Sequence, residues 1–407
     1  MNHTLCIAWR NLWRNPRRTL ITVVAIGLNV AVLIASYGLM EGILEHFLSS
    51  ATNIVVGEVQ IHSPKFLVDR SMYRDLEAPD DILSRLKRWN LPAVARSYGF
   101  GLVAHGTKSA GTLFWGVDPV AERSVFDLAG NVLEGSFLSP VPQGGIVLGK
   151  KLARTLNVSV GDEIIVVVQA ADGSLGNELY HVRGILKNVG DRIDREAAIL
   201  HREDFKTLFV SGGRIHEIAV NTRGKVPLER LKEMAARAAP GAEIKTWRDL
   251  LPSLSDMMNF FDASMWLMGM IFFIAAALGV MNTMLMSTFE RIREFGILKA
   301  LGATPWRILL DVAAEAWVLG LISTLAGILI GLPLTYYLQV AGLDLSMFAS
   351  GDVSVAGVAL DPIWRAALAP KTVAVPVVVM WVVCLLASLY PAAIAARLDP
   401  VKAMVRT

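Results

Sequence analysis

The chain has 407 residues, of which 54% are hydrophobic and 18% are charged, and its mean hydropathy is +0.48. The charged share is below the roughly 25% of an ordinary soluble protein, and a net charge of +3 is too small to indicate nucleic-acid binding. Its two cysteines, Cys6 and Cys384, lie outside residues 51–250, so that segment cannot contain a disulfide. Two isolated cysteines also do not make a zinc site of the usual kind.

Four apolar segments are each long enough to cross a bilayer as a helix, because a hydrocarbon core about 30 Å thick needs roughly 20 residues. They are residues 20–40, 263–288, 308–338 and 372–396. The first could instead be a cleaved signal peptide, since arginines precede it. Its apolar run has full span length and lacks a clear small-residue cleavage site, which favours an uncleaved anchor helix.

Basic residues near the ends of these spans predict the topology. Four arginines and no acid precede the first span, and the loop 289–307 carries four basic residues against two acids. The loop 339–371 carries two basic residues against three acids. The positive-inside rule therefore places both termini and the loop 289–307 in the cytoplasm, with residues 51–250 outside.

The long segment 51–250 mixes strand and helix patterns, which predicts an α+β domain whose strand order does not follow from the sequence. The expected strands are residues 53–62, 163–169, 179–186 and 215–221, and the expected helices are residues 80–89, 150–156 and 227–238. Helical spacing continues through residues 41–50 and 251–261, so both flanking spans are expected to extend outward as stalks. The alternative is that these two stretches are simply edges of the domain.

Residues 144–151 nearly match the phosphate-binding loop G-x-x-x-x-G-K-[ST], but Lys151 replaces the hydroxyl residue that would hold Mg²⁺. The seven histidines are scattered, none pairs at metal-ligand spacing, and no nucleophile elbow is recognisable. The chain is therefore not expected to be an enzyme or to hold a metal.

The third span carries an acid and a row of glycines. Glu315 lies about two turns inside it, where a carboxylate costs about 2–3 kcal/mol and must face protein or water. A proton relay and a bundle-facing carboxylate bonded to a neighbouring helix both fit; the second is favoured because the other spans offer no partner acid or histidine. Gly320, Gly327 and Gly331 predict a close helix-packing surface, either within the chain or between subunits.

The loop after the second span reads FERIREFGILKALGAT over residues 289–304, which predicts a short charged helix with an apolar stripe, ending at Gly302. It resembles the E-R-x-x-E-[FI]-G-I-x-[KR]-A-[LI]-G-A signature of the MacB/FtsX/LolC superfamily of ABC-transporter permeases. The opening AWRNLWRNPRR (8–18) and the tail YPAAIAARLDPVKAM (390–404) are similar to the two ends of such permeases, and residues 146–167 resemble the core of their outer domain.

The resemblance implies an α-helical protein of the bacterial inner membrane with four transmembrane helices (1+3) and a large α+β extracytoplasmic domain between helices 1 and 2. The expected division is: cytoplasmic segment 1–19, helix and stalk 20–50, MacB-like domain 51–250, stalk and helix 251–288, coupling helix 289–307, helix 308–338, outer loop 339–371, helix 372–396 and cytoplasmic tail 397–407.

The resemblance also implies the partners: a second permease copy or a paralogue, membrane lipids, a periplasmic lipoprotein carrier, and a cytoplasmic ABC ATPase that binds ATP and Mg²⁺ in place of this chain. ATP-driven motion would pass along the first two helices to the outer domain. The ATPase contact is carried over to Glu290, Arg291, Arg293, Glu294, Gly296, Lys299 and Gly302.

Three functions remain open within this superfamily. MacB-type exporters carry their ATPase ahead of the first span, whereas only residues 1–19 precede it here, so a separate ATPase polypeptide is expected. That separation and the WRDLLP sequence at 247–252 favour a LolC/LolE-like permease for lipoprotein release. MacB-type export of peptides, drugs or lipids is the alternative, followed by FtsX-like regulation of cell-wall hydrolases without transport.

Overall fold

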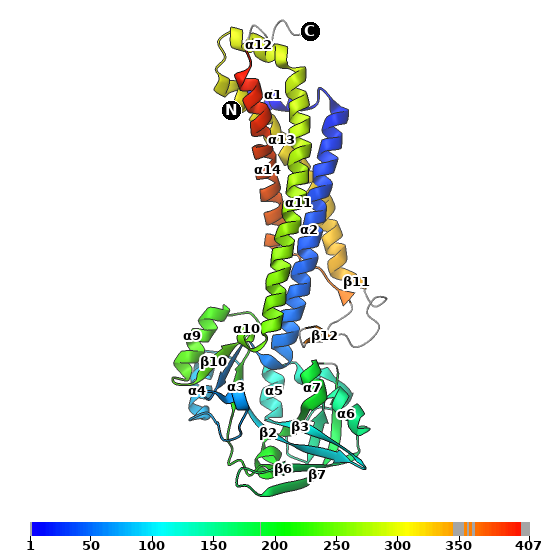
Figure 1. The fold of residues 1–407 in the computed structure, drawn as a ribbon, viewed down its shortest axis with the longest axis vertical. Helices are drawn as coiled ribbons and strands as arrows, with labels where there is room; N and C mark the ends of the chain where they lie inside the picture. Colours follow the sequence, from blue (N-terminus) through cyan, green and yellow to red (C-terminus); the bar gives the residue numbers. More distant parts are fainter. Residues whose placement is uncertain (1, 188, 345–353, 356–357, 360–362, 400–407) are drawn as a thin grey trace. The chain divides into compact units, whose positions relative to one another are not determined.

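The computed structural model describes residues 2–187, 189–344, 354–355, 358–359 and 363–399 (Figure 1). The chain divides into two compact units. The helical unit comprises Met1–Leu44, Met258–Met347 and Pro362–Thr407, and the sheet domain comprises Glu45–Met257 and Phe348–Asp361.

Four helices in the described part of the chain are long and apolar enough to cross a membrane, and the four predicted spans lie within them. The helices that contribute to the helical unit are α1 (Asn2–Leu12), α2 (Pro16–Ala51), α11 (Pro252–Glu290), α12 (Ile292–Ala300), α13 (Pro305–Val340) and α14 (Pro370–Arg397). Two short strands, β11 (Leu343–Asp344) and β14 (Ile363–Trp364), pair antiparallel. Residues 41–50 and 252–261 are helical, as their spacing predicts.

The predicted glycine surface of α13 packs against two other helices of this chain. A Cβ added to Gly327 would lie 2.5 Å from the Cβ of Val30 in α2, and Gly331 meets the next part of the same helix. A Cβ added to Gly320 would lie 2.9 Å from Trp381 in α14. Because backbones approach this closely only where side chains are absent, these glycines serve packing inside the chain.

The sheet domain is built on a ten-stranded sheet in the order β10-β1-β9-β2-β3-β8-β5-β7-β4, with β6 pairing to β2 and β7. Its strands are β1 (Val59–His62), β2 (Ala93–His105), β3 (Lys108–Val117), β4 (Val132–Gly135), β5 (Gly145–Leu148), β6 (Glu163–Gln169), β7 (Leu175–Leu186), β8 (Ala197–His201), β9 (Glu217–Val220) and β10 (Glu243–Thr246). Its helices are α3 (Phe66–Asp69), α4 (Pro79–Arg88), α5 (Pro119–Val125), α6 (Lys150–Leu156), α7 (Asp191–Glu196), α8 (Arg202–Leu208), α9 (Leu228–Ala238) and α10 (Trp247–Leu250). The α+β prediction is confirmed.

The predicted strand 53–62 is wrong in its first half. Residues Thr52–Val56 form a π-helical turn, η1, and only Val59–His62 enters the sheet. Gly57 separates the two at φ +77°, a conformation that glycine adopts without strain. The β-branched run before this glycine therefore continues the preceding helix as a wider turn and does not begin the strand.

The hairpin of β2 and β3 was missed by the sequence analysis because glycines interrupt its apolar alternation. These glycines make room for aromatic rings: a Cβ at Gly99 would lie 2.4 Å from Phe209, and one at Gly116 would lie 2.7 Å from Phe205. Both phenylalanines are fully buried and stack on each other in the core of the sheet domain.

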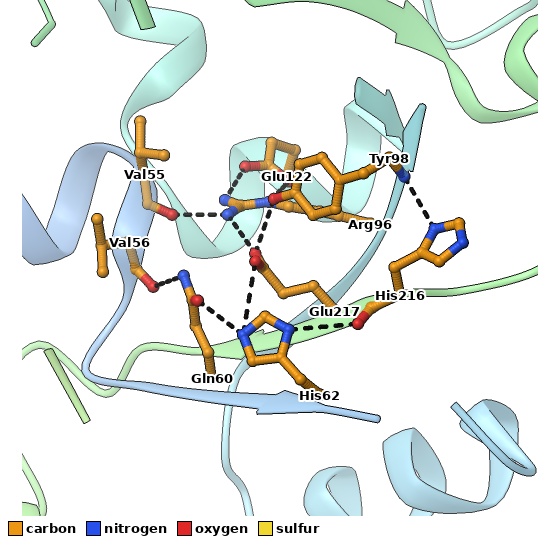
Figure 2. Close-up of polar contacts among 9 residues, drawn as sticks. All are labelled: Val55, Val56, Gln60, His62, Arg96, Tyr98, Glu122, His216 and Glu217. Atoms are coloured by element: carbon orange, nitrogen blue, oxygen red, sulfur yellow. Dashed lines mark hydrogen bonds and ion pairs between the residues drawn. The ribbon is translucent and has the colours of Figure 1, made fainter. Parts of the chain in front are cut away.

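A buried ion cluster joins several elements of this domain (Figure 2). The Arg96 guanidinium donates to Glu122 at 2.5 Å and to Glu217 at 3.0 Å. It also donates to the Val55 carbonyl at 2.6 Å, and the Tyr98 hydroxyl donates to Glu217 at 3.0 Å. Burial alone would lower the pKa of Arg96, but the two carboxylates outweigh it and raise that pKa, so the guanidinium stays charged.

Candidate functional site

The signature loop forms a short helix set between two breaks. Helix α11 ends at Glu290, Arg291 leaves helical geometry, and α12 runs from Ile292 to Ala300. Gly302 then takes φ +92°, a left-handed conformation that favours glycine and closes the helix end. The predicted helix exists but is shorter than residues 289–304.

Arg291 turns inward at the first break and pairs with the acid inside α13. Its Nη1 donates to Glu315 Oε1, and Asn11 of α1 donates to the same oxygen at 2.7 Å. Only 11% of the Arg291 side chain and 3% of the Glu315 side chain are exposed. The structure therefore agrees with a carboxylate that faces protein and bonds to neighbouring elements.

The N-terminal segment is held to the same loop by further ion pairs. Arg14 pairs with Glu294 at 2.5 Å, and Arg18 pairs with Glu290 at 3.1 Å. Arg291 also donates to Glu294 at 3.0 Å. Burial alone would raise the pKa of Glu294, but Arg14 and Arg291 outweigh it and lower that pKa, so the carboxylate is ionised.

The inner face of α12 packs against α13 and α14. Phe295 is buried with Ile308 of α13 and Ala392 of α14, and Gly296 is buried beside it. Lys299 donates from Nζ to the Leu398 carbonyl at 2.7 Å. These contacts fix the orientation of the short helix on the end of the bundle.

Large apolar side chains are exposed on α12, at its C-terminal end and at the start of α13. We call them the α12 surface: Ile297 (44% exposed), Leu298 (40%), Leu301 (80%) and Trp306 (65%). Exposed large apolar groups that lie together mark interaction sites. At 3.6 residues per turn, Ile297 lies on roughly the opposite side of α12 from the buried Phe295, which the signature alone did not indicate.

The seven residues expected at an ATPase contact thus separate into two groups. Glu290, Arg291, Glu294 and Lys299 bond within the chain, and Gly296 is buried; Arg293 and Gly302 are exposed. The ion pairs and packing arrange the loop, while the α12 surface is what it presents outward. A docking role for any of them stays a prediction.

The stretch that resembles a phosphate-binding loop leads into a short helix of the sheet domain. Lys150 and Lys151 begin α6, and Lys151 pairs with Asp191 of the following helix. Among the described residues there is no group of three or more His, Cys, Asp and Glu side chains that could hold a metal ion.

Comparison with known proteins identifies the family. The MacB-like periplasmic core domain model matches residues 19–249, and the FtsX-like permease C-terminal model matches residues 266–400. An uncharacterized ABC transporter permease of Methanocaldococcus jannaschii is 22% identical over 82% of this chain and 84% of its own.

Two other relatives carry functional names. The lipoprotein-releasing system transmembrane protein LolC of Xylella fastidiosa is 24% identical over 74% of each chain. The macrolide export ATP-binding/permease protein MacB of Marinobacter nauticus is 28% identical over 53% of this chain and 35% of its own. A permease of this kind implies a partner ATPase. The chain belongs to the MacB/FtsX/LolC family of ABC-transporter permeases, as a membrane protein with an extracytoplasmic domain between its first and second apolar helices.

Proposed function

We propose that this permease subunit couples a separate cytoplasmic ATPase to the extracytoplasmic domain by mechanical transmission, and that the work releases lipoproteins from the inner membrane. The observation that carries the proposal is the ion pair between Arg291 and Glu315, because it joins the loop that follows α11 to the interior of α13. A displacement of α12 would therefore be transmitted to the transmembrane helices through this buried ion pair.

The α12 surface is the proposed binding site for the ATPase. This surface consists of apolar side chains with the exposed Arg293 beside them. The opposite side of α12, which carries Phe295, packs against α13 and α14. Arg14 lies just before α2 and pairs with Glu294, and Arg18 lies in the first turn of α2 and pairs with Glu290. Motion of the loop is therefore also transmitted to the first transmembrane helix. ATP and Mg²⁺ belong to the ATPase, and none of these residues needs to bind either.

Lipoprotein release is preferred as the cargo function because the LolC relative aligns over 74% of both chains. A second permease, either a copy or a paralogue, and a periplasmic lipoprotein carrier complete this proposal. The alternative is MacB-type export of peptides, drugs or lipids. It is supported by the match of the MacB-like core domain to residues 19–249.

The experiment reconstitutes the chain with its ATPase and second permease in proteoliposomes that contain a fluorescent triacylated lipoprotein. The proposal expects ATP-dependent transfer of the lipoprotein to a soluble carrier, and no transfer with a non-hydrolysable ATP analogue. Transport of a macrolide or peptide without lipoprotein transfer would contradict lipoprotein release and support the exporter function. ATP turnover with neither activity would contradict both.

A further inference from the structure

The sheet domain contains a cavity of about 230 Å³ that no step of the proposed coupling uses. Its lining comes from the end of α2 (Ser50, Ala51), from η1, from β2 and β3, from α7, and from Leu250 and Leu251 at the end of α10. All of these residues belong to one compact unit. An engineered cavity of about 150 Å³ is already large enough to hold benzene, so this one accommodates a larger apolar group.

The walls are apolar. They are formed mainly by Ile54, Val55, Phe66, Leu113, Trp115 and Ile193. Such a lining favours a hydrocarbon group, since an apolar cavity offers water few hydrogen-bond partners.

Several polar side chains in the lining are already hydrogen-bonded within the chain. Arg96 is bonded to Glu122, Glu217 and a carbonyl, and the Tyr98 hydroxyl donates to Glu217 (Figure 2). Gln60 donates to the Val56 carbonyl at 2.7 Å. These side chains therefore have no strong need for a ligand group.

Two donors in the lining are different. The Arg70 guanidinium, in the described part of the chain, makes no hydrogen bond or ion pair, although it lines the cavity and is half-buried. The buried indole Nε1–H of Trp115 also lacks an acceptor among the described residues. Both groups are hydrogen-bond donors and cannot accept, so a ligand that satisfies them must supply an acceptor.

A second guanidinium lies near the first. Arg192 lines the same cavity, is exposed, and forms an ion pair at 3.6 Å with Glu196, which also lines the cavity. Burial first, and then the positive charge of Arg192, lower the pKa of Arg70, and the opposing charges of Glu217 and Glu196 do not fully offset them. Two cations that repel each other beside an apolar chamber are stabilised by an anion placed between them.

We propose that this cavity binds an amphipathic anion, with its hydrocarbon chain among the apolar walls and its carboxylate or phosphate at Arg70 and Arg192. The proposal does not depend on which cargo the permease serves. A bound molecule would touch Ser50 and Ala51, the last residues before η1, and also Leu250 and Leu251, which immediately precede α11. It would therefore contact both segments through which the domain continues into transmembrane helices.

The test measures binding of radiolabelled octanoate to the full chain in phosphatidylcholine nanodiscs, with empty nanodiscs subtracted. Saturable binding is expected, with competition by octyl phosphate and none by octanol or octyltrimethylammonium. Comparing the affinities of octanoate and dioctanoyl phosphatidic acid identifies the ligand class. Tighter binding of octanoate indicates a free fatty acid, and tighter binding of dioctanoyl phosphatidic acid indicates a membrane lipid.

The variants R70Q and R192Q are each expected to weaken octanoate binding about tenfold, because each removes one charged hydrogen-bond donor. R70K keeps the charge and should retain binding within a few-fold. R74Q and R195Q are matched controls: Arg74 pairs with Asp69 and Arg195 pairs with Asp191, and neither lines the cavity.

Three results would overturn the proposal. They are an absence of saturable binding, equal binding of octanol and octanoate, and unchanged affinity in both R70Q and R192Q. Because R192Q alters an exposed side chain, its effect does not depend on folding of the cavity wall.

Discussion

Arg291 and Glu315 form a buried ion pair that ties the break between α11 and α12 to the interior of α13. A charge at this depth is tolerated only when it is paired and hydrogen-bonded. Glu315 meets both conditions through Arg291 and Asn11. The same arginine reaches Glu294, so one side chain connects the loop to the bundle.

The pair predicts a characteristic double-mutant cycle. R291M leaves Glu315 buried without its partner and should destabilise the chain by about 3 kcal/mol or more, because removing one member of a buried pair exposes the other to a desolvation cost. The double variant R291M/E315L removes both charges and should recover most of that loss. SDS-induced unfolding in bicelles measures the free energies, and additive effects of the two single changes would contradict this account.

The close contact between α2 and α13 predicts that replacing Gly327 destabilises the protein more than replacing a glycine outside this contact. G327A places a methyl group 2.5 Å from Val30 and should destabilise the bundle by about 1–3 kcal/mol, as overpacking does. The control is G279A in α11, where a Cβ has no neighbour within 4 Å. Thermal unfolding in nanodiscs compares the two, and equal melting temperatures would show that Gly327 is not at a tight contact.

The His216 ring predicts a loss of stability in acid. Its Nδ1 accepts the Tyr98 N–H at 2.9 Å and its Nε2 lies 2.9 Å from the Met72 carbonyl, an arrangement that requires the neutral ring. Burial lowers the pKa of His216 below its usual value of about 6.5. The unfolded chain therefore takes up the proton first, and stability falls as the pH drops through about 6.5, by up to about 1.4 kcal/mol per pH unit.

Hydrogen exchange at the Tyr98 amide, corrected for intrinsic rates, follows this effect between pH 7.5 and 5.5. H216Q should flatten the dependence, whereas H181Q, which alters an exposed ring, should retain it. The same pH dependence in wild type and H216Q would assign the effect to other groups.

The charge distribution predicts which parts of the chain face the cytoplasm. Alkaline phosphatase fused after Asp172 should be active, because that turn between β6 and β7 belongs to the extracytoplasmic domain. A fluorescent protein fused after Thr407 should fluoresce, since the positive-inside rule retains the tail in the cytoplasm. An inactive phosphatase together with a non-fluorescent C-terminal fusion would indicate the reverse topology. The α12 surface would then lie outside the cytoplasm, where the ATPase could not bind it.

Sequence reasoning succeeded where a signal is local. Hydropathy located the four membrane-length helices found among the described residues. Strand β6 was predicted with its observed bounds, because β-branched residues and a preceding turn mark it. The pairing of β1 with both β9 and β10 joins segments more than 150 residues apart, as the bond between His62 and His216 illustrates. No local pattern encodes such a partner.

The coupling loop shows the same limit. Its signature identified the right segment, but it could not indicate that Arg291 points inward to Glu315 while Leu301 points outward. That distinction arises from the helix break at Arg291 and from the packing of Phe295, both of which depend on α13 and α14.

The most direct test of the account replaces Leu301 with a photocrosslinking amino acid in cells that produce the full chain, with Leu175 of β7 as the control. Both positions are 80% exposed in the structure. The account predicts that residue 301 crosslinks to a subunit that mass spectrometry identifies as an ABC ATPase, and that residue 175 does not. Efficient crosslinking at 175 to that ATPase, or none at 301 in an assembled, ATP-hydrolysing complex, would contradict it.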